Sequence, residues 1–480
     1  MSRVSSVNAR WWALVVLGLT QLMVVLDSTI VAIALPSAQA DLGMADSQRQ
    51  WLVTAYALAF ASLLLLGGRV ADYWGRKRTF MVGMLGFGVA STWGGLAQSS
   101  GELIAARGLQ GLFAAMLAPA ALAMVTVLFS HGKERNVAFA IFGVIAGTGA
   151  AFGLLLGGVL TQYADWRWCL LVNDFFVVAG LIGGWLLLDE SRAEGNNKYD
   201  VFGTVTIVLG LGSLVYGFAR AEHGWGETDT VGFLAVGAVL LAIFFWSQAR
   251  IANPLLPLRV VLHRVRAAAF MIQGVVGVVM MGAMLYLTFH FQIVLGMSPV
   301  KAGLANVAMT VVIMGTAPLA TKAFSHFGAR PVLVAGPVIG SVGLFYLSGI
   351  TAGGSYWTEV LPALVILGCG MSLIFVPMQN LALAGVEPHD AGVASAFANS
   401  CLHIGGSIAI AVFTALYTSS MEDSLASGSA PLTALADGYG TTFTAAGVVM
   451  LVGAVLAGLL INQKGGAPAA DQEQAVLAAH

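Results

Sequence analysis

Three ionisable residues lie inside long apolar stretches of this 480-residue sequence, where a charge needs a partner or a function. Asp27 lies about eight residues from the end of the first stretch, Arg107 about five residues into the fourth, and Asp174 about seven residues into the sixth. With a helical rise of about 1.5 Å per residue, the three would lie at a similar depth. Because a charge at the centre of a bilayer costs roughly 2.5–3.5 kcal/mol on insertion scales, each is a candidate functional group.

Asp27 has the chemistry of a proton carrier or of a site for a cationic substrate. Removal from water favours the protonated form of a carboxyl group, and a neighbouring base such as Arg107 opposes this. The alternative is a structural carboxylate that pairs with Arg107 or with a backbone group. Similar alternatives hold for Asp174 and for His403, which lies near the middle of another apolar stretch. We predict that Asp27, Arg107, Asp174 and His403 take part in proton coupling.

A second set of side chains offers contacts for a bound molecule. Amides and imidazoles in apolar stretches can contact a substrate or join two helices, and aromatic and methionine side chains offer an adaptable surface. For any single member, packing inside the protein is the alternative. The predicted substrate-binding residues are Asp27, Tyr56, Gln110, Met116, His290, Gln292, Phe375, Gln379, Asn380 and Asn399.

The elements that carry these residues are predicted to be membrane-spanning α-helices. Only 9% of the residues are charged and 58% are hydrophobic, whereas a soluble domain has about 25% charged residues. A span needs about 20 mostly apolar residues. We expect fourteen spans, at 11–35, 50–67, 79–98, 103–128, 137–160, 168–188, 202–219, 230–248, 267–291, 302–321, 331–350, 357–378, 393–417 and 440–462.

Lysine and arginine predict the orientation of these spans, because cytoplasmic loops are enriched in both. With the N-terminus inside, only four of the 22 cations fall in outer loops, namely Arg49, Arg167, Arg220 and Lys301. Arg107 lies within a span, and the others lie on the inner side. Both termini are therefore expected to be cytoplasmic.

A faint repeat suggests how the spans are grouped. The loop at 68–77 and the loop at 321–330 share the spacing from a polar residue to a glycine and then to a cation. We predict a six-helix bundle over 1–190, two inserted helices over 191–260, a second six-helix bundle over 261–464 and a disordered cytoplasmic tail over 465–480. Two parallel halves around a central cavity are a transporter design.

These residues stand in a recognisable pattern. Residues 26–36 resemble the first-helix motif of the fourteen-helix drug:proton antiporters, a family of the major facilitator superfamily. Residues 68–78 are similar to the superfamily's second-to-third loop motif, and 107–111 to its fourth-helix motif. The segment 166–173 and the spacing from Gln292 to Gly303 also fit. Together these matches cover most of the chain, and they carry more weight than any short match alone.

The resemblance implies a major facilitator fold and particular roles for some residues. Asp27 would be the membrane acid used for coupling or for cationic drugs, and Arg107 the base linked to proton movement. The loop would form a cytoplasmic gate, although it also serves as a topogenic positive loop. The implied gating residues are Arg69, Asp72, Gly75, Arg76 and Lys77.

The sequence departs from the family pattern in two places. In the fifth helix, Gly149, Gly153, Gly157 and Gly158 permit close helix packing, but Leu154 replaces the expected proline and its kink. In the sixth helix the proline expected two residues after the asparagine is absent, and Asp174 adds a charge. These changes suggest a narrower substrate range.

Together, the residues favour a secondary active transporter that exports amphipathic compounds in exchange for protons. A lipid or metabolite transporter of the same fold, without proton coupling, is the first alternative, and a membrane receptor that moves no ligand is the second. We found no nucleophile–base pair, nucleotide loop or metal-ligand cluster, so we expect no enzyme activity, cofactor or metal. The expected partners are a small-molecule substrate, protons and membrane lipids, but not nucleic acid. We expect a monomer in the cell membrane.

Overall fold

Helices cover the predicted apolar stretches and extend beyond most of them. The computed structural model describes residues 7–129, 132–192, 200–221, 224–251, 254–382, 384, 386 and 391–461. The first group of helices is α1 (Val7–Leu42), α2 (Asp46–Trp74), α3 (Arg76–Gly95), α4 (Ser100–Leu128), α5 (Gly132–Tyr163) and α6 (Trp168–Leu187). The predicted tail at 465–480 lies outside the described residues.

Two helices follow this group, and then a second bundle. The inserted pair is α7 (Val201–Arg220) and α8 (Thr228–Gln248), and the short α9 (Leu258–Val261) leads into the second bundle. One continuous helix there consists of α10 (Arg264–Gly277), the π-helical η2 (Val278–Ala283), α11 (Met284–Phe289) and the π-helical η3 (His290–Val294). The remaining elements are α12 (Pro299–Phe327), α13 (Ala329–Leu347), η4 (Tyr356–Val360), α14 (Leu361–Ala382), α15 (Ala391–Ala426) and α16 (Pro431–Leu460).

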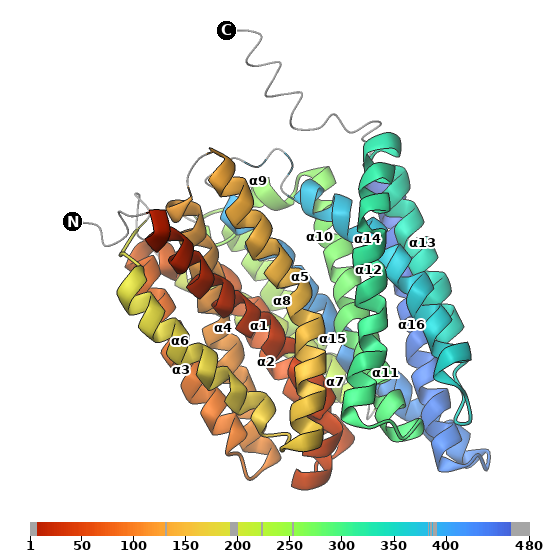
Figure 1. The fold of residues 1–480 in the computed structure, drawn as a ribbon. Coiled ribbons are helices and arrows are strands. Elements are labelled where there is room, and N and C mark those ends of the chain that lie inside the picture. Colours follow the sequence, from red (N-terminus) through yellow and green to blue (C-terminus); the bar gives the residue numbers. More distant parts are fainter. Residues whose placement is uncertain are drawn as a thin grey trace.

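The helices form two bundles that lie side by side, with α1–α6 on the left of Figure 1 and α10–α16 on the right. α5 and α12 meet at the front of this view, while α2 and α15 also pack against each other. Helix α7 contacts both α2 and α15, so the inserted pair lies against both bundles.

Twelve of the described helices are long and apolar enough to cross a membrane. Of the other two expected spans, α3 begins with three basic residues and is rich in glycine. In α5, the apolar stretch Gly149–Tyr163 is shorter than a full membrane span. An all-helical membrane fold is therefore established, and the count of fourteen crossings stays a prediction.

Glycines allow α5 to approach α1 closely. Gly149, Gly153 and Gly157 all face α1, and a Cβ atom at Gly157 would lie 2.8 Å from the carbonyl oxygen of Ile30. This is the face expected for a small-residue packing stripe in a membrane helix. The three glycines therefore hold α1, which carries Asp27, against α5.

A second close approach joins the two bundles. A Cβ atom at Gly158 would lie 2.8 Å from the carbonyl oxygen of Pro299 at the start of α12, and one at Gly303 would lie 2.6 Å from that of Leu154. Leu154 occupies the place where the family pattern has proline. The backbone of α5 is thus in direct contact with α12 at this position.

Further contacts between the bundles lie towards the same end, which is the outer end in the predicted orientation. The Gln292 amide donates to the Ile33 carbonyl oxygen at 3.0 Å, and the Gln50 amide donates to the Tyr286 hydroxyl at 3.0 Å. These contacts join α1 to η3 and α2 to α11. The bundles are therefore in close contact at their outer ends.

We predict that Gly303→Ala weakens the contact between the bundles, whereas Gly315→Ala does not. Both changes raise helix propensity by up to about 1 kcal/mol, but a Cβ atom at Gly315 meets nothing within 4 Å. At Gly303 the new methyl group meets backbone, which cannot rotate away, so the variant should be about 1–3 kcal/mol less stable than its control. Thermal unfolding in detergent measures this difference, and equal stabilities would contradict the assigned contact.

Candidate functional site

An acid–base pair is buried inside the first bundle. One guanidinium nitrogen of Arg107, on α4, lies 2.7 Å from the Asp27 carboxylate on α1, and the two side chains are 1% and 0% exposed. The Arg107 Nε–H donates to the carbonyl oxygen of Leu52, on α2, at 3.2 Å. This bond ties a third helix to the pair.

Two side-chain amides complete the surroundings of the carboxylate. Gln110, on α4, donates to Asp27 Oδ1 at 3.2 Å, and Asn173, on α6, donates to the same oxygen at 2.7 Å. Both amides also donate to the hydroxyl of Ser91, on α3, at 2.6 and 3.3 Å respectively. All of these side chains are buried, so five helices contribute to one polar cluster.

The Arg107 guanidinium is held on two further sides. The ring centre of Tyr56, on α2, lies 4.4 Å from its central carbon, which is a cation–π geometry. The Gln110 Oε1 atom accepts from Arg107 at 2.8 Å. Since desolvation of two charges can exceed their attraction, such a pair is tolerated only where further hydrogen bonds satisfy it, as they do here.

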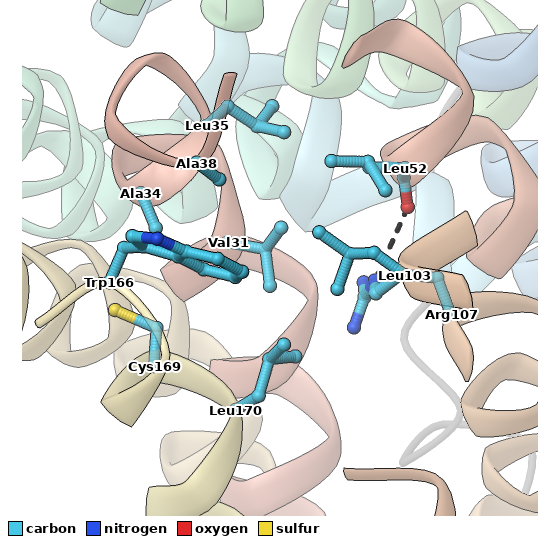
Figure 2. A pocket seen from close by; sticks show the side chains of 10 residues that line it. All are labelled: Val31, Ala34, Leu35, Ala38, Leu52, Leu103, Arg107, Trp166, Cys169 and Leu170. Atoms are coloured by element: carbon cyan, nitrogen blue, oxygen red, sulfur yellow. Dashed lines mark hydrogen bonds between the residues drawn. The ribbon is translucent and has the colours of Figure 1, made fainter. Parts of the chain in front are cut away.

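A small cavity lies on the outer side of Arg107 (Figure 2). Its volume of about 10 Å³ is at the lower limit of what holds one water molecule. Apolar side chains including Val31, Leu35, Leu103 and Trp166 form most of its lining. This apolar lining therefore lies between the ion pair and the outer loops.

The other two predicted proton-coupling residues lie outside this cluster. Asp174 is partly exposed and accepts a hydrogen bond from Thr92 at 3.0 Å, and it does not contact the pair. His403 packs against Phe60 with ring centres 4.6 Å apart, where α15 meets α2. The structure thus joins Asp27 to Arg107 but does not bring Asp174 or His403 to them.

The predicted substrate contacts are dispersed. Tyr56 and Gln110 belong to the Asp27 cluster, and Gln292 bonds to Ile33 as described above. His290 is fully buried inside the second bundle near Tyr439, and neither ring nitrogen has a hydrogen-bond partner within the described part of the chain.

Three of the remaining predicted contacts are partly or fully exposed. Met116 and Phe375 are partly buried on α4 and α14, and the exposed Asn399 side chain donates back to Ser395 of its own helix. The side chains of Gln379 and Asn380 lie outside the described part of the structure.

The predicted gating residues gather at the inner end of the first bundle. Asp72 pairs with Arg76 at 2.9 Å, and Arg69 donates to the carbonyl oxygen of Pro254 at 3.1 Å, in the segment between α8 and α9. The Lys77 ammonium donates to the Leu188 carbonyl oxygen at 2.6 Å, at the end of α6.

The predicted gating loop also contains a turn that requires glycine. Gly75 has φ of 126°, a backbone conformation suited to glycine, and a Cβ atom there would lie 2.5 Å from the Glu190 carboxylate. That carboxylate accepts the backbone N–H groups of Lys77 and Arg78 at the start of α3. The loop is therefore fixed to the α6 end.

Sequence reasoning did not single out two members of the cluster. Asn173 enters the sequence pattern only as the last residue of the 166–173 motif, and Ser91 belongs to none of the motifs. A serine in an apolar helix is common and often bonds its own backbone, so its type carries no signal. Within the described ranges, no group of three or more His, Cys, Asp or Glu side chains could hold a metal ion.

Two bundles of apolar helices, the first of which encloses a hydrogen-bonded acid–base pair, place the chain in the class of two-bundle integral membrane proteins. A family model described as Major Facilitator Superfamily matches residues 17–410. The chain belongs to the major facilitator superfamily, as the motifs predicted, and it is a multi-spanning protein of the cell membrane.

Several drug-resistance and export proteins are similar along most of their length. A puromycin resistance protein of Streptomyces alboniger is 42% identical over 95% of this chain and 92% of its own. A cephamycin export protein of Amycolatopsis lactamdurans is 36% identical over 95% and 94%. The fold is similar to a crystal structure of an auto-inhibited peptide transporter of the POT family, with a TM-score of 0.69 at 15% identity over 96% of this chain and 99% of the other.

We predict that removal of the Asp27 charge and removal of the Arg107 charge lower the stability of the protein by different amounts. Asp27→Asn leaves the Arg107 guanidinium, which cannot lose its proton, buried without a counter-charge, and should destabilise the protein by about 3–5 kcal/mol. Arg107→Met leaves a carboxyl group that can take up a proton, so it should cost less at acidic pH and more at alkaline pH.

Unfolding in detergent at several pH values measures both effects. The variant that combines Asp27→Asn with Arg107→Met is the control, because it removes both charges and should recover much of the stability lost in Asp27→Asn. A pH-independent cost for Arg107→Met, with full additivity in the double variant, would show that the two side chains do not interact.

Proposed function

We propose that this protein is a proton-coupled exporter of amphipathic small molecules that works by alternating access. The Asp27–Arg107 pair carries the proposal, because a buried carboxylate with a permanent cation and two amides around it is a site that can exchange a proton. Asp27 is the proton carrier, and Arg107 stabilises its ionised form. Asp174 and His403 are further candidates for coupling.

The proposed topology is that of fourteen crossings with both termini in the cytoplasm. The helices α1–α6 and α10–α16 form the two moving halves, while α7 lies against both and α8 packs on α7. The bias of basic residues towards one side supports this orientation. The residues from Arg69 to Lys77 then lie at the cytoplasmic end, where they act as a gate.

The proposed cycle starts from a state closed at its outer end. Asp27 takes up a proton from outside once the α5–α12 contact opens, and a bound substrate leaves in that state. The proton is released to the cytoplasm after the bundles turn back. Moving one charge inward is worth about 2.3 kcal/mol per 100 mV, which corresponds to roughly a fifty-fold substrate gradient.

The proposed cargo is an antibiotic or a compound of similar amphipathic character. This follows from the functions of the relatives, which include resistance to puromycin and export of a cephamycin. The partly exposed Met116 and Phe375 offer such a compound a soft apolar surface. The exposed Asn399 offers it a polar contact. Tyr56, Gln110, His290, Gln292, Gln379 and Asn380 complete the proposed substrate set.

We predict that Asp27→Asn abolishes uptake of puromycin into inverted vesicles under an imposed pH gradient, because the variant has no group to carry the proton. Asp229→Asn is a matched control, since it removes the same charge from an exposed side chain of α8, outside the proposed coupling and substrate residues, and should keep at least about half of the uptake. Radiolabelled puromycin, followed with and without the gradient, measures both.

Other results would favour the alternatives. Full uptake by Asp27→Asn would remove the proposed role of the pair. Uptake that ignores the pH gradient, or a lipid that remains bound through purification, would favour a lipid or metabolite transporter. Binding without any uptake, for puromycin and a cephamycin alike, would favour a receptor.

A further inference from the structure

The side-chain amide of Asn173 has an oxygen atom that takes no part in the hydrogen bonds around the ion pair. Its Nδ2 group donates to Asp27 Oδ1 at 2.7 Å and to the Ser91 hydroxyl at 3.3 Å. Its Oδ1 atom is buried and has no hydrogen-bond partner among the residues that the structure describes. A buried acceptor without a partner is costly, and this one lies on the same amide that touches the carboxylate.

Gln110 provides a comparison, because it has the same amide chemistry and bonds the same two partners. Its Nε2 donates to Asp27 Oδ1 and to Ser91. Its Oε1, however, accepts from Arg107 at 2.8 Å. Turning the Gln110 amide would break that bond and face two donors towards each other, so Gln110 is fixed as a donor.

We propose that Asn173 is a positioning residue whose amide turns over when Asp27 takes up its proton. An ionised carboxylate needs donors, whereas a protonated one also needs an acceptor for its O–H. After a half turn of the amide, Oδ1 accepts from the Asp27 O–H and from the Ser91 O–H. The two hydrogen bonds are kept with their directions reversed, and Asn173 stabilises both states of the proposed proton carrier.

The surroundings permit this exchange. Ser91 accepts from both amides in the observed state, and a hydroxyl hydrogen can rotate to donate instead. Of the chargeable groups around Asp27, Arg107 faces it from α4 and Tyr56 lies beyond Arg107 on α2. Asp174 is turned to Thr92, and α5 meets α1 through glycines. None of these groups offers the protonated carboxyl an acceptor.

Infrared difference spectroscopy on the native chain with ¹³C-labelled asparagine tests the turn directly. Protonation should shift a side-chain amide carbonyl band to lower frequency, because Oδ1 changes from no partner to two donors. The same shift should be missing in Asp27→Asn, which cannot be protonated, and in Asn173→Leu. A labelled amide band that ignores protonation, or a shift that persists in Asn173→Leu, would overturn the proposal.

The pH midpoint of transport gives a second readout, with Gln110→Leu as the matched control. Loss of a fixed donor to the carboxylate should raise the midpoint by about one pH unit or more in Gln110→Leu. Asn173→Leu removes support from both protonation states, so its midpoint should move by less than about half a unit while transport slows. A rise as large as that of Gln110→Leu would show that Asn173 is only a donor.

The inference rests on the proposed role of Asp27, and the two can fail separately. If the carboxyl band that appears on acidification is unchanged in Asp27→Asn, then Asp27 does not titrate and the proposed function fails. If that band is lost but the Asn173 amide does not respond, the proton carrier stands and the turning amide is wrong.

Discussion

The buried ion pair between Asp27 and Arg107 is the interaction on which the first bundle depends. Neither charge is tolerated alone in an apolar interior, and each is satisfied by groups from other helices. Leu52 brings α2 to the pair, Asn173 brings α6, and Ser91 brings α3 through the two amides. Helix α1 is therefore fixed in both depth and rotation, because a shift of one turn would separate the Asp27 carboxylate from its three donors, Arg107, Gln110 and Asn173.

The contact between the bundles is of a different kind. It includes close backbone approaches at Gly158 and Gly303, single hydrogen bonds from neutral amides such as Gln292, and the Arg49 guanidinium over the Phe289 ring. None of these contacts is an ion pair between the bundles, so they can be broken and remade without separating two opposite charges, whereas the cluster inside the first bundle cannot. This difference favours movement of the two bundles as rigid bodies over rearrangement within the first one.

The sequence was sufficient for the helices, which follow from apolar length, and for the family, which follows from the motifs. Which way a side chain faces could not be predicted. Asp174 lies at the depth of the pair, but it is one residue beyond Asn173, which is about a quarter turn around α6. The amide therefore reaches Asp27 while the carboxylate reaches Thr92. Ser91 could not be predicted either, since only the fold brings α3 to the two amides.

The outer end of α2 belongs both to the ion pair and to the contact between the bundles. The carbonyl of Leu52 accepts from Arg107, and two residues earlier the amide of Gln50 donates to Tyr286 in the second bundle. A proton on Asp27 removes the charge that holds Arg107 in place, so the position of Arg107 depends on protonation of Asp27. Arg107 is also the donor to the Leu52 carbonyl oxygen. Because Gln50 and Leu52 share one rigid helical turn, displacement of that turn acts on the Tyr286 contact as well. The chain thus contains a direct physical route from the proposed protonation site to the contact between the bundles that opens in the proposed cycle.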